Sequence, residues 1–191
     1  VLLRWTAFAK AKITADRSRG EPLVDPATGW YSRQGLARRA QELAQQAFRQ
    51  HAPLACVVFA FAEPAAPGGS HDPAPLVLRG CARALNDDGR GSDVVGRLGP
   101  GEVAILAPAT DVDGAFLLAR RLSSSLEGAA RTAEPKSAVR LRAGYDAVAN
   151  VGYAPTDPVA LILRAATAAR QGSDAAPIRR FGGSPAVRVG V

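Results

Sequence analysis

The hydrophobic positions of the chain fall into two patterns, one typical of strands and the other of helices. Residues 54–63 form a nearly continuous apolar run, rich in β-branched and aromatic side chains, as expected of a strand covered on both faces. Two more apolar runs, 94–98 and 103–107, flank Gly-Pro-Gly at 99–101, and residues 138–145 alternate like a half-exposed strand. Proline presets φ at one central turn position and glycine accepts a positive φ at the next. The pattern therefore predicts a β-hairpin with its tip at Gly-Pro-Gly.

Helical periodicity marks four other segments. From Arg33 to about Gln50, apolar residues recur on one face, and arginines and glutamines cover the other. A second helix is expected near 76–85, and a third follows the hairpin, where Asp113 can cap it. Asp157 and Pro158 give the fourth helix a cap and a first-turn proline. The residues predicted on buried helix faces are Leu36, Ala40, Leu43 and Ala47; Ala115, Leu118, Ala119, Leu122 and Leu126; and Val159, Ile162, Leu163 and Ala166.

The net charge of +7 does not by itself indicate a nucleic-acid partner. The 24 basic residues include only 3 lysines and are dispersed along the chain. Base-stacking aromatics interleaved with basic residues are missing as well. High arginine together with high alanine favours the composition bias of a GC-rich genome over a DNA-binding face, so no nucleic acid is expected among the partners.

Other chemistry is sparse. Cys56, in the apolar run, and Cys81, in the second helix, have no metal or redox spacing and are predicted to be small core residues. His71 and Asp72 have no second histidine or cysteine nearby, so we interpret them as a solvated loop tip rather than a metal or acid-base pair. No run reaches the length of a membrane span and no signal-peptide pattern is present. These features predict a soluble, cytoplasmic domain without membrane insertion, although a parent protein could be membrane-anchored.

Several motifs are similar to those of a known family. Residues 90–103 read Arg-Gly-Ser-Asp-Val-Val-Gly-Arg-Leu-Gly-Pro-Gly-Glu-Val. They resemble the hairpin of GGDEF (diguanylate cyclase) domains, which is Arg-Tyr/Leu-Gly-Gly-Asp/Glu-Glu-Phe preceded by Arg-x-x-Asp. Residues 25–36 resemble the family's Asp-Pro-Leu-Thr-Gly-Leu-x-Asn-Arg-Arg opening, and residues 138–145 its Val-Thr-x-Ser-Ile-Gly strand. The resemblance implies an α/β (α+β) fold of the nucleotidyl-cyclase-like type, a three-layer sandwich whose central, mainly antiparallel β-sheet is flanked by helices.

The resemblance also suggests the domain boundaries. We expect the GGDEF-like domain to span residues 25–191, with 187–191 as an edge strand that closes the sheet. Residues 1–24 are interpreted as the tail of an upstream linker or signalling helix. Because the sequence does not begin with Met, it is expected to be a piece of a longer protein.

The residues that hold the metal in active relatives are replaced here. Gly101 stands where the family has the acidic hairpin residue that holds Mg²⁺, and Ala60 and Ala62 fall on its two strand aspartates. None of these side chains offers an oxygen ligand. We interpret Glu102, the remaining acid, as a solvated strand residue. Phosphoryl transfer depends on positioning and metal neutralisation, so the resemblance implies an inactive cyclase without catalytic or metal-binding residues and without a Mg²⁺ cofactor.

The family's contacts to GTP are altered too. Residues 63–75, with four prolines and two glycines, favour an irregular loop where active relatives place a short helix that grips guanine and ribose. Near the end of the last helix, Arg170 and Ser173 lie close to the family's Tyr and Lys positions, so the phosphate-binding lysine is absent.

The product-binding motif of the family is retained. In GGDEF domains the Arg-x-x-Asp motif forms an inhibitory site (I-site) for cyclic di-GMP, and Arg90 and Asp93 stand at that spacing. An arginine fork matches guanine O6 and N7, and a carboxylate accepts from guanine N1 and N2. Such a pair arises easily by chance in a charged chain, so its place before the hairpin carries the weight. Counting from the hairpin puts Arg121 on the family's second ligand arginine, whereas a slip of one residue would transfer that role to Arg120.

The resulting hypothesis is a catalytically inactive GGDEF-like domain that acts as a cyclic di-GMP receptor through Arg90, Asp93 and Arg121. The ligand would bridge two domains, through self-association or a neighbouring domain, and relay the messenger level to a larger parent protein. Three alternatives stay open: a dimerisation or protein-interaction scaffold that binds no nucleotide, a GTP-sensing regulatory domain, and a residual enzyme with unusual ligands.

Overall fold

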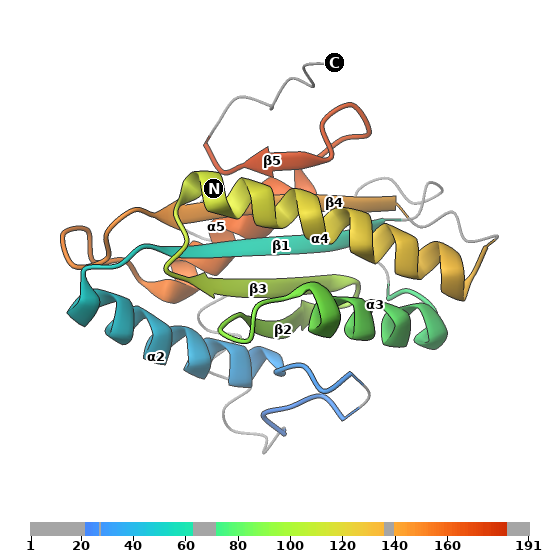
Figure 1. Cartoon of the computed structure of the whole chain (residues 1–191), viewed down its shortest axis with the longest axis horizontal. Coiled ribbons are helices and arrows are strands. Elements are labelled where there is room, and N and C mark those ends of the chain that lie inside the picture. Colours follow the sequence, from blue (N-terminus) through green and yellow to red (C-terminus); the bar gives the residue numbers. More distant parts are fainter. Residues whose placement is uncertain (1–21, 27, 63–71, 136–139, 183–191) are drawn as a thin grey trace.

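The computed structural model describes residues 22–26, 28–62, 72–135 and 140–182. Helices and strands alternate along most of this length (Figure 1). In chain order the elements are α2 (Arg33–Gln50), β1 (Leu54–Ala62), α3 (Pro75–Asp88), β2 (Val94–Gly99), β3 (Glu102–Pro108), α4 (Val112–Ala133), β4 (Arg140–Val148), α5 (Pro158–Arg170) and β5 (Ile178–Arg180).

The strands form one five-stranded sheet in the order β2-β3-β1-β4-β5. The pairs β2 with β3, β3 with β1 and β1 with β4 are antiparallel, and only β4 with β5 is parallel. The apolar strand β1 lies at the centre, where both of its faces are covered. The predicted central, mainly antiparallel sheet is therefore confirmed.

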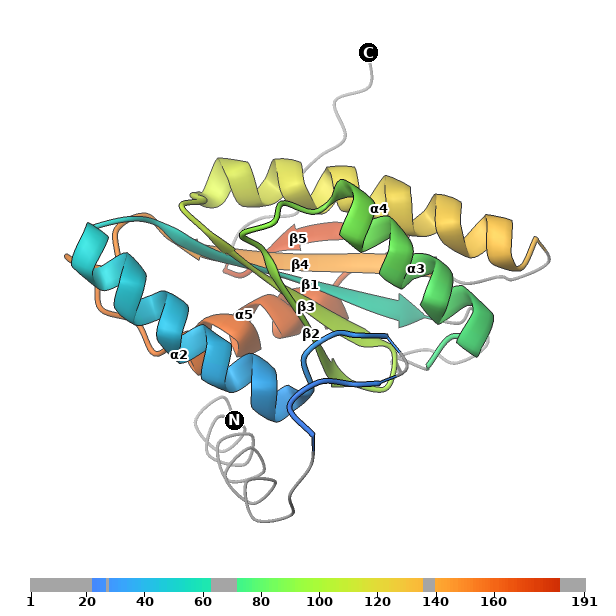
Figure 2. The same cartoon turned by 60° about the horizontal axis from the view of Figure 1, so that its bottom comes forward.

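Helices cover both faces of the sheet. Figure 2 shows α3 and α4 on one side, and α2 and α5 on the other. Successive residues of β1 point to opposite faces, so Phe59 packs in the core under α3 and α4, and Val58 in the core under α2 and α5. Both side chains are fully buried. The result is the predicted three-layer sandwich.

The helix α5 lies unusually close to β4. A Cβ added to Gly144 would be 2.1 Å from the Ala169 nitrogen and 2.2 Å from the Ala165 oxygen, both of them backbone atoms of α5. Glycine at this position allows the helix to rest directly on the strand.

Most sequence predictions of local structure hold. The first helix spans the predicted residues, and the hairpin turns at the predicted tip, where Gly101 has a φ of +62°. Cys56 and Cys81 are buried and free, and burial raises the pKa of the Cys81 thiol to about 11. The predicted edge strand at 187–191 and the linker up to residue 21 lie outside the described residues.

One predicted helix cap is wrong. The N-cap of α4 is Asp111, whose carboxylate accepts from the Gly114 N–H at 2.9 Å, whereas Asp113 lies in the first turn. The helix begins two residues earlier than expected, and Asp113 instead places a negative charge near the positive end of the helix dipole.

The chain before α2 is joined to the edge strand β2. Asp25 and Trp30 close a turn through the Asp25 N–H and the Trp30 carbonyl at 2.7 Å. Tyr31 then donates to the Val95 carbonyl at 2.9 Å and accepts from the Arg97 N–H at 2.8 Å. This segment thus adds a short stretch of pairing to the outer edge of the sheet.

Within the part of the chain that the structure describes, no helix is both long and apolar enough to cross a membrane.

The contact at Gly144 generates a stability prediction. Gly144→Ala should lower the free energy of unfolding by about 3 kcal/mol, because the methyl group collides with the backbone of α5 rather than with a movable side chain. Urea denaturation measures the change. Gly128→Ala in α4 is the control, since nothing lies within 4 Å of the added Cβ, and it should stabilise the protein by about 0.5 kcal/mol. Equal effects of the two substitutions would contradict the packing described for Gly144.

Candidate ligand-binding site

The predicted pair Arg90 and Asp93 lies in the turn between α3 and β2. The helix ends with the Gly89 N–H donating to the Leu85 carbonyl at 2.9 Å. Two reciprocal hydrogen bonds then close the turn: the Asp93 N–H donates to the Arg90 carbonyl at 2.9 Å, and the Arg90 N–H donates to Asp93 Oδ2 at 3.1 Å. The turn therefore fixes the position of the Asp93 carboxylate relative to Arg90.

The carboxylate of Asp93 is held by only one of its two oxygens. Asp93 Oδ1 is buried and has no hydrogen-bond partner among the described residues. Burial raises the pKa of Asp93, and the Arg90 N–H and the charges of Arg90 and Arg121 offset part of that rise. A buried acceptor without a donor costs free energy, so Oδ1 is a position where a ligand N–H would be stabilised.

Arg121 lies near enough to Asp93 for its charge to act on the Asp93 carboxyl group. Arg121 is an exposed residue of α4 whose positive charge lowers the pKa of Asp93. The neighbouring Arg120 instead lies over the Phe116 ring, with 6.0 Å between its guanidinium carbon and the ring centroid. Of the two candidate arginines, Arg121 is the one whose charge acts on Asp93.

A pocket of about 230 Å³ opens beside this turn. Its volume is below the roughly 300–1,000 Å³ of sites that enclose a drug-sized ligand, so it can accept one flat ring system rather than a whole dinucleotide. The lining has an apolar and a polar part: Leu85, Val95, Ile105 and Leu122 are apolar, and Asn86, Arg90 and Asp93 are polar.

Asn86 is the lining residue that sequence reasoning missed. It is an exposed residue in the last turn of α3 and adds an amide, with both donors and an acceptor, to the pocket. Its position four residues before Arg90 was the available signal, but an exposed Asn near a helix end usually has a capping role.

Glu102 lies in the β2–β3 hairpin, at the other end of β2 from Asp93. Its interpretation as a solvated strand residue is wrong. Glu102 is only 5% exposed. Both of its carboxylate oxygens accept from Arg170, from Nε and from a terminal nitrogen, at 2.7 Å each. Arg170 is 68 residues away along the chain, so the hairpin acid is neutralised by a cation from the end of α5.

The positions predicted to lack metal ligands lie next to this ion pair. Ala60 is paired directly with Glu102 across β1 and β3, and the side chain of Ala62 lies outside the described part of the structure. The described residues contain no group of three or more His, Cys, Asp or Glu side chains that could hold a metal ion.

The hairpin tip is also bound by a carboxylate from another part of the chain, that of Asp72. Asp72 Oδ1 accepts from the Gly101 N–H at 2.7 Å and from the guanidinium of Arg97, which in turn pairs with Asp25 at 3.3 Å. Asp72 is exposed, as the sequence predicted, and it is also paired with the hairpin. His71 and the rest of residues 63–71 lie outside the described residues. Because the Gly101 N–H already donates to the Asp72 carboxylate, it is not available to a ligand phosphate at the tip.

Solved structures of the same fold are GGDEF domains. The GGDEF domain of FimX from Pseudomonas aeruginosa has a TM-score of 0.64 at 17% identity, covering 84% of this chain and 99% of that one. The GGDEF domain of DgcB from Caulobacter crescentus, in complex with c-di-GMP, has a TM-score of 0.63 at 12% identity, covering 86% and 96%. The active GGEEF domain of a diguanylate cyclase from Vibrio cholerae has a TM-score of 0.63 at 20% identity, covering 80% and 98%.

The sequence itself matches the family described as "Diguanylate cyclase, GGDEF domain" over residues 23–175. The chain therefore belongs to the GGDEF domain family, and the resemblance seen in its motifs is confirmed. No curated protein sequence matches the chain.

The buried ion pair of the hairpin generates a prediction. Arg170→Met should lower the free energy of unfolding by about 2 kcal/mol, because it leaves the Glu102 carboxylate buried without a counter-charge, and partial exposure of Arg170 limits the loss. Adding Glu102→Gln should restore at least half of the loss, as measured by urea denaturation. Arg131→Met, which removes an exposed pair with Glu127, is the control and should change stability by less than about 0.5 kcal/mol. Equal losses in the two single variants would contradict the role given to the pair.

Proposed function

We propose that this GGDEF domain is a catalytically inactive receptor for cyclic di-GMP, which binds at Arg90, Asp93 and Arg121 and relays the messenger level to a larger parent protein. The observation that carries the proposal concerns Asp93: its buried Oδ1 has no donor among the described residues, and the residue lines a pocket together with Arg90. A carboxylate oxygen in that state favours a ligand that brings its own N–H groups.

Guanine matches this arrangement. The N1 and N2 hydrogens of guanine can donate to Asp93, and an arginine fork can donate to O6 and N7 of the same base. The apolar part of the pocket suits the faces of one purine ring. The charge of Arg121, which reaches Asp93, also favours a dianionic ligand.

A similar domain supports the choice of ligand. The GGDEF domain of DgcB, whose fold this chain shares, was solved in complex with c-di-GMP. The net charge of +7 further favours an anionic ligand over a neutral one.

The pairing of the charged and polar groups of the hairpin within the chain supports the loss of cyclase activity. Gly101 has no side chain that could bind a metal. The Glu102 carboxylate forms an ion pair with Arg170, and the Gly101 N–H donates to the Asp72 carboxylate. A metal–triphosphate complex would have to displace Arg170 from Glu102 and Asp72 from the Gly101 N–H before it could bind the hairpin. Without metal neutralisation, phosphoryl transfer loses most of its catalytic stabilisation.

The relay is proposed to use β2. This strand begins directly after Asp93, and its outer edge pairs with Tyr31 through Val95 and Arg97. A ligand that fixes the Arg90–Asp93 turn would thus also restrict the strand that holds the chain before α2. Because the pocket takes one base and cyclic di-GMP has two, the second base is available to another copy or domain. Cross-linking stabilises only the arrangement that presents both surfaces, which shifts the population of domain orientations.

Calorimetric titration with cyclic di-GMP tests the binding site. The native chain should bind, and Arg90→Ala and Asp93→Asn should each weaken binding about tenfold to a hundredfold, since one bidentate base contact contributes roughly 1–3 kcal/mol. Arg38→Ala is the control, because this exposed arginine is on α2, on the opposite face of the sheet. It should bind like the native chain.

Other outcomes of the titration favour other functions. No heat with cyclic di-GMP would favour a scaffold that binds no nucleotide, and binding of GTP alone would favour a GTP sensor. Binding that is unchanged in Arg90→Ala would contradict the site assignment.

A turnover assay tests the loss of activity separately. Incubation of the domain with GTP and either Mg²⁺ or Mn²⁺ should yield no cyclic di-GMP by chromatography, because the hairpin offers the metal no free carboxylate. Product formation that is abolished by Glu102→Gln would contradict this part of the proposal and indicate a residual enzyme.

A further inference from the structure

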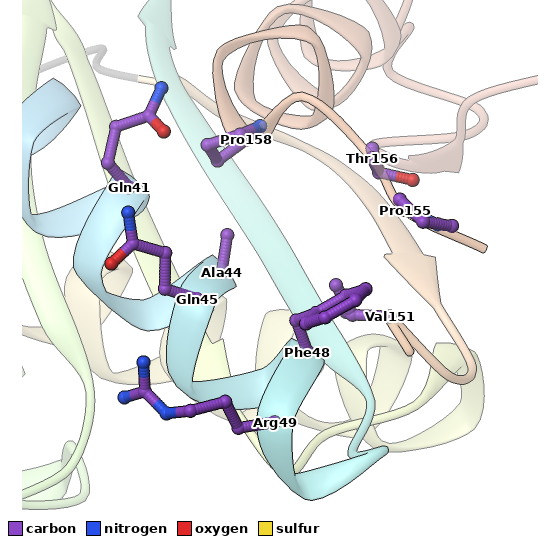
Figure 3. A pocket seen from close by; sticks show the side chains of 9 residues that line it. All are labelled: Gln41, Ala44, Gln45, Phe48, Arg49, Val151, Pro155, Thr156 and Pro158. Carbon is purple, nitrogen blue, oxygen red and sulfur yellow. The ribbon is translucent and has the colours of Figure 1, made fainter. Parts of the chain in front are cut away.

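A second pocket lies on the opposite face of the sheet from the Arg90–Asp93 turn. It has a volume of about 290 Å³ and is formed by the second half of α2 and the loop 149–157 that leads into α5. Figure 3 shows Gln41, Gln45 and Arg49 along one side, and Val151, Pro155 and Thr156 on the other.

The pocket has an exposed apolar centre. The ring of Phe48 points toward Val151 in Figure 3, and the side chain is 49% exposed although Val151 itself is buried. Tyr153 is 83% exposed and lies against the His51 ring, with 5.2 Å between ring centroids. Two large aromatic side chains are thus presented to solvent around the end of α2, where covering them would be favourable.

The walls of the pocket are held in place by backbone contacts. The Val151 N–H donates to the Ala52 carbonyl at 3.1 Å, and the Ala154 N–H donates to the Asn150 carbonyl at 3.0 Å. A Cβ on Gly152 would be 2.2 Å from His51 Nδ1, so the loop is in direct contact with the end of α2. A partner would therefore bind a preformed surface and lose little free energy in ordering it.

The charge of the pocket indicates what would bind. Arg49 is the charged residue of the lining, and among the described residues it has no ion pair. The other polar lining residues, Gln41, Gln45 and Thr156, are neutral, and none of the lining residues is acidic. The pocket therefore combines an apolar contact surface with an uncompensated guanidinium, which is complementary to an apolar side chain next to a carboxylate.

We propose that this pocket is a docking site for an acidic segment of a partner protein that carries an apolar anchor. The anchor packs on Phe48 and Val151, a carboxylate of the segment pairs with Arg49, and the amides of Gln41 and Gln45 hydrogen-bond its backbone. The net charge of +7 assists the approach of such a segment.

Nuclear magnetic resonance titration of the ¹⁵N-labelled chain tests the proposal with three capped hexapeptides. The first, Glu-Asp-Phe-Leu-Glu-Asp, should shift the amide signals of Phe48, Val151 and Thr156. Its basic counterpart, Lys-Lys-Phe-Leu-Lys-Lys, and its counterpart without an anchor, Glu-Asp-Gly-Gly-Glu-Asp, should bind at least tenfold more weakly. Each comparison isolates one element, the charge or the apolar contact.

Variants locate the contact. Arg49→Glu and Phe48→Ala, both changes of exposed side chains, should each weaken binding of the first peptide at least fivefold. Arg83→Glu on α3 and Leu76→Ala, which removes a 56% exposed side chain, are the matched controls and should leave binding unchanged. The proposal is overturned by absent binding of the first peptide, by equal binding of the basic one, or by shifts that persist in both pocket variants.

Discussion

The hydrogen bond from the Arg90 N–H to one oxygen of Asp93 is the interaction on which the proposed function depends. It locks a short turn between α3 and β2, and it leaves the second carboxylate oxygen buried and without a donor among the described residues. Burial raises the pKa of this carboxyl group, and the positive charges of Arg90 and Arg121 keep that rise smaller. The domain thus bears a free-energy cost that a ligand with N–H donors would relieve.

The two ends of β2 contrast in this respect. At its start, charged groups face an open pocket. At its end, the hairpin acid Glu102 is paired with Arg170, and the hairpin amide of Gly101 with Asp72. The charged groups of the hairpin are thus paired within the chain, and the proposed loss of catalysis rests on this pairing. Between these ends, the pairing with Tyr31 gives β2 a direct connection to the chain before α2.

Local signals in the sequence were enough for most of the fold. The continuous apolar run of β1 predicted a central strand, and the periodicity of residues 33–50 predicted α2, because both depend on burial of neighbouring residues. The cap of α4 was assigned to Asp113 instead of Asp111 because two acids stand two residues apart, and only the backbone geometry distinguishes them. Glu102 was misjudged because its partner comes from another helix, a contact that no local pattern contains.

The candidate site is predicted from the spacing of Arg90 and Asp93 and from counting to Arg121. The structure joins Arg90 and Asp93 in one turn, and the charge of Arg121, on α4, acts on Asp93. Titration of the Asp93 carboxyl carbon by nuclear magnetic resonance, with and without cyclic di-GMP, tests the central claim most directly. In the free protein the pKa of Asp93 should lie above that of an ordinary aspartate. Saturating ligand should lower the pKa, because guanine N–H groups stabilise the ionised form. A pKa that the ligand leaves unchanged or raises would show that Asp93 does not accept from the base, and would contradict the account.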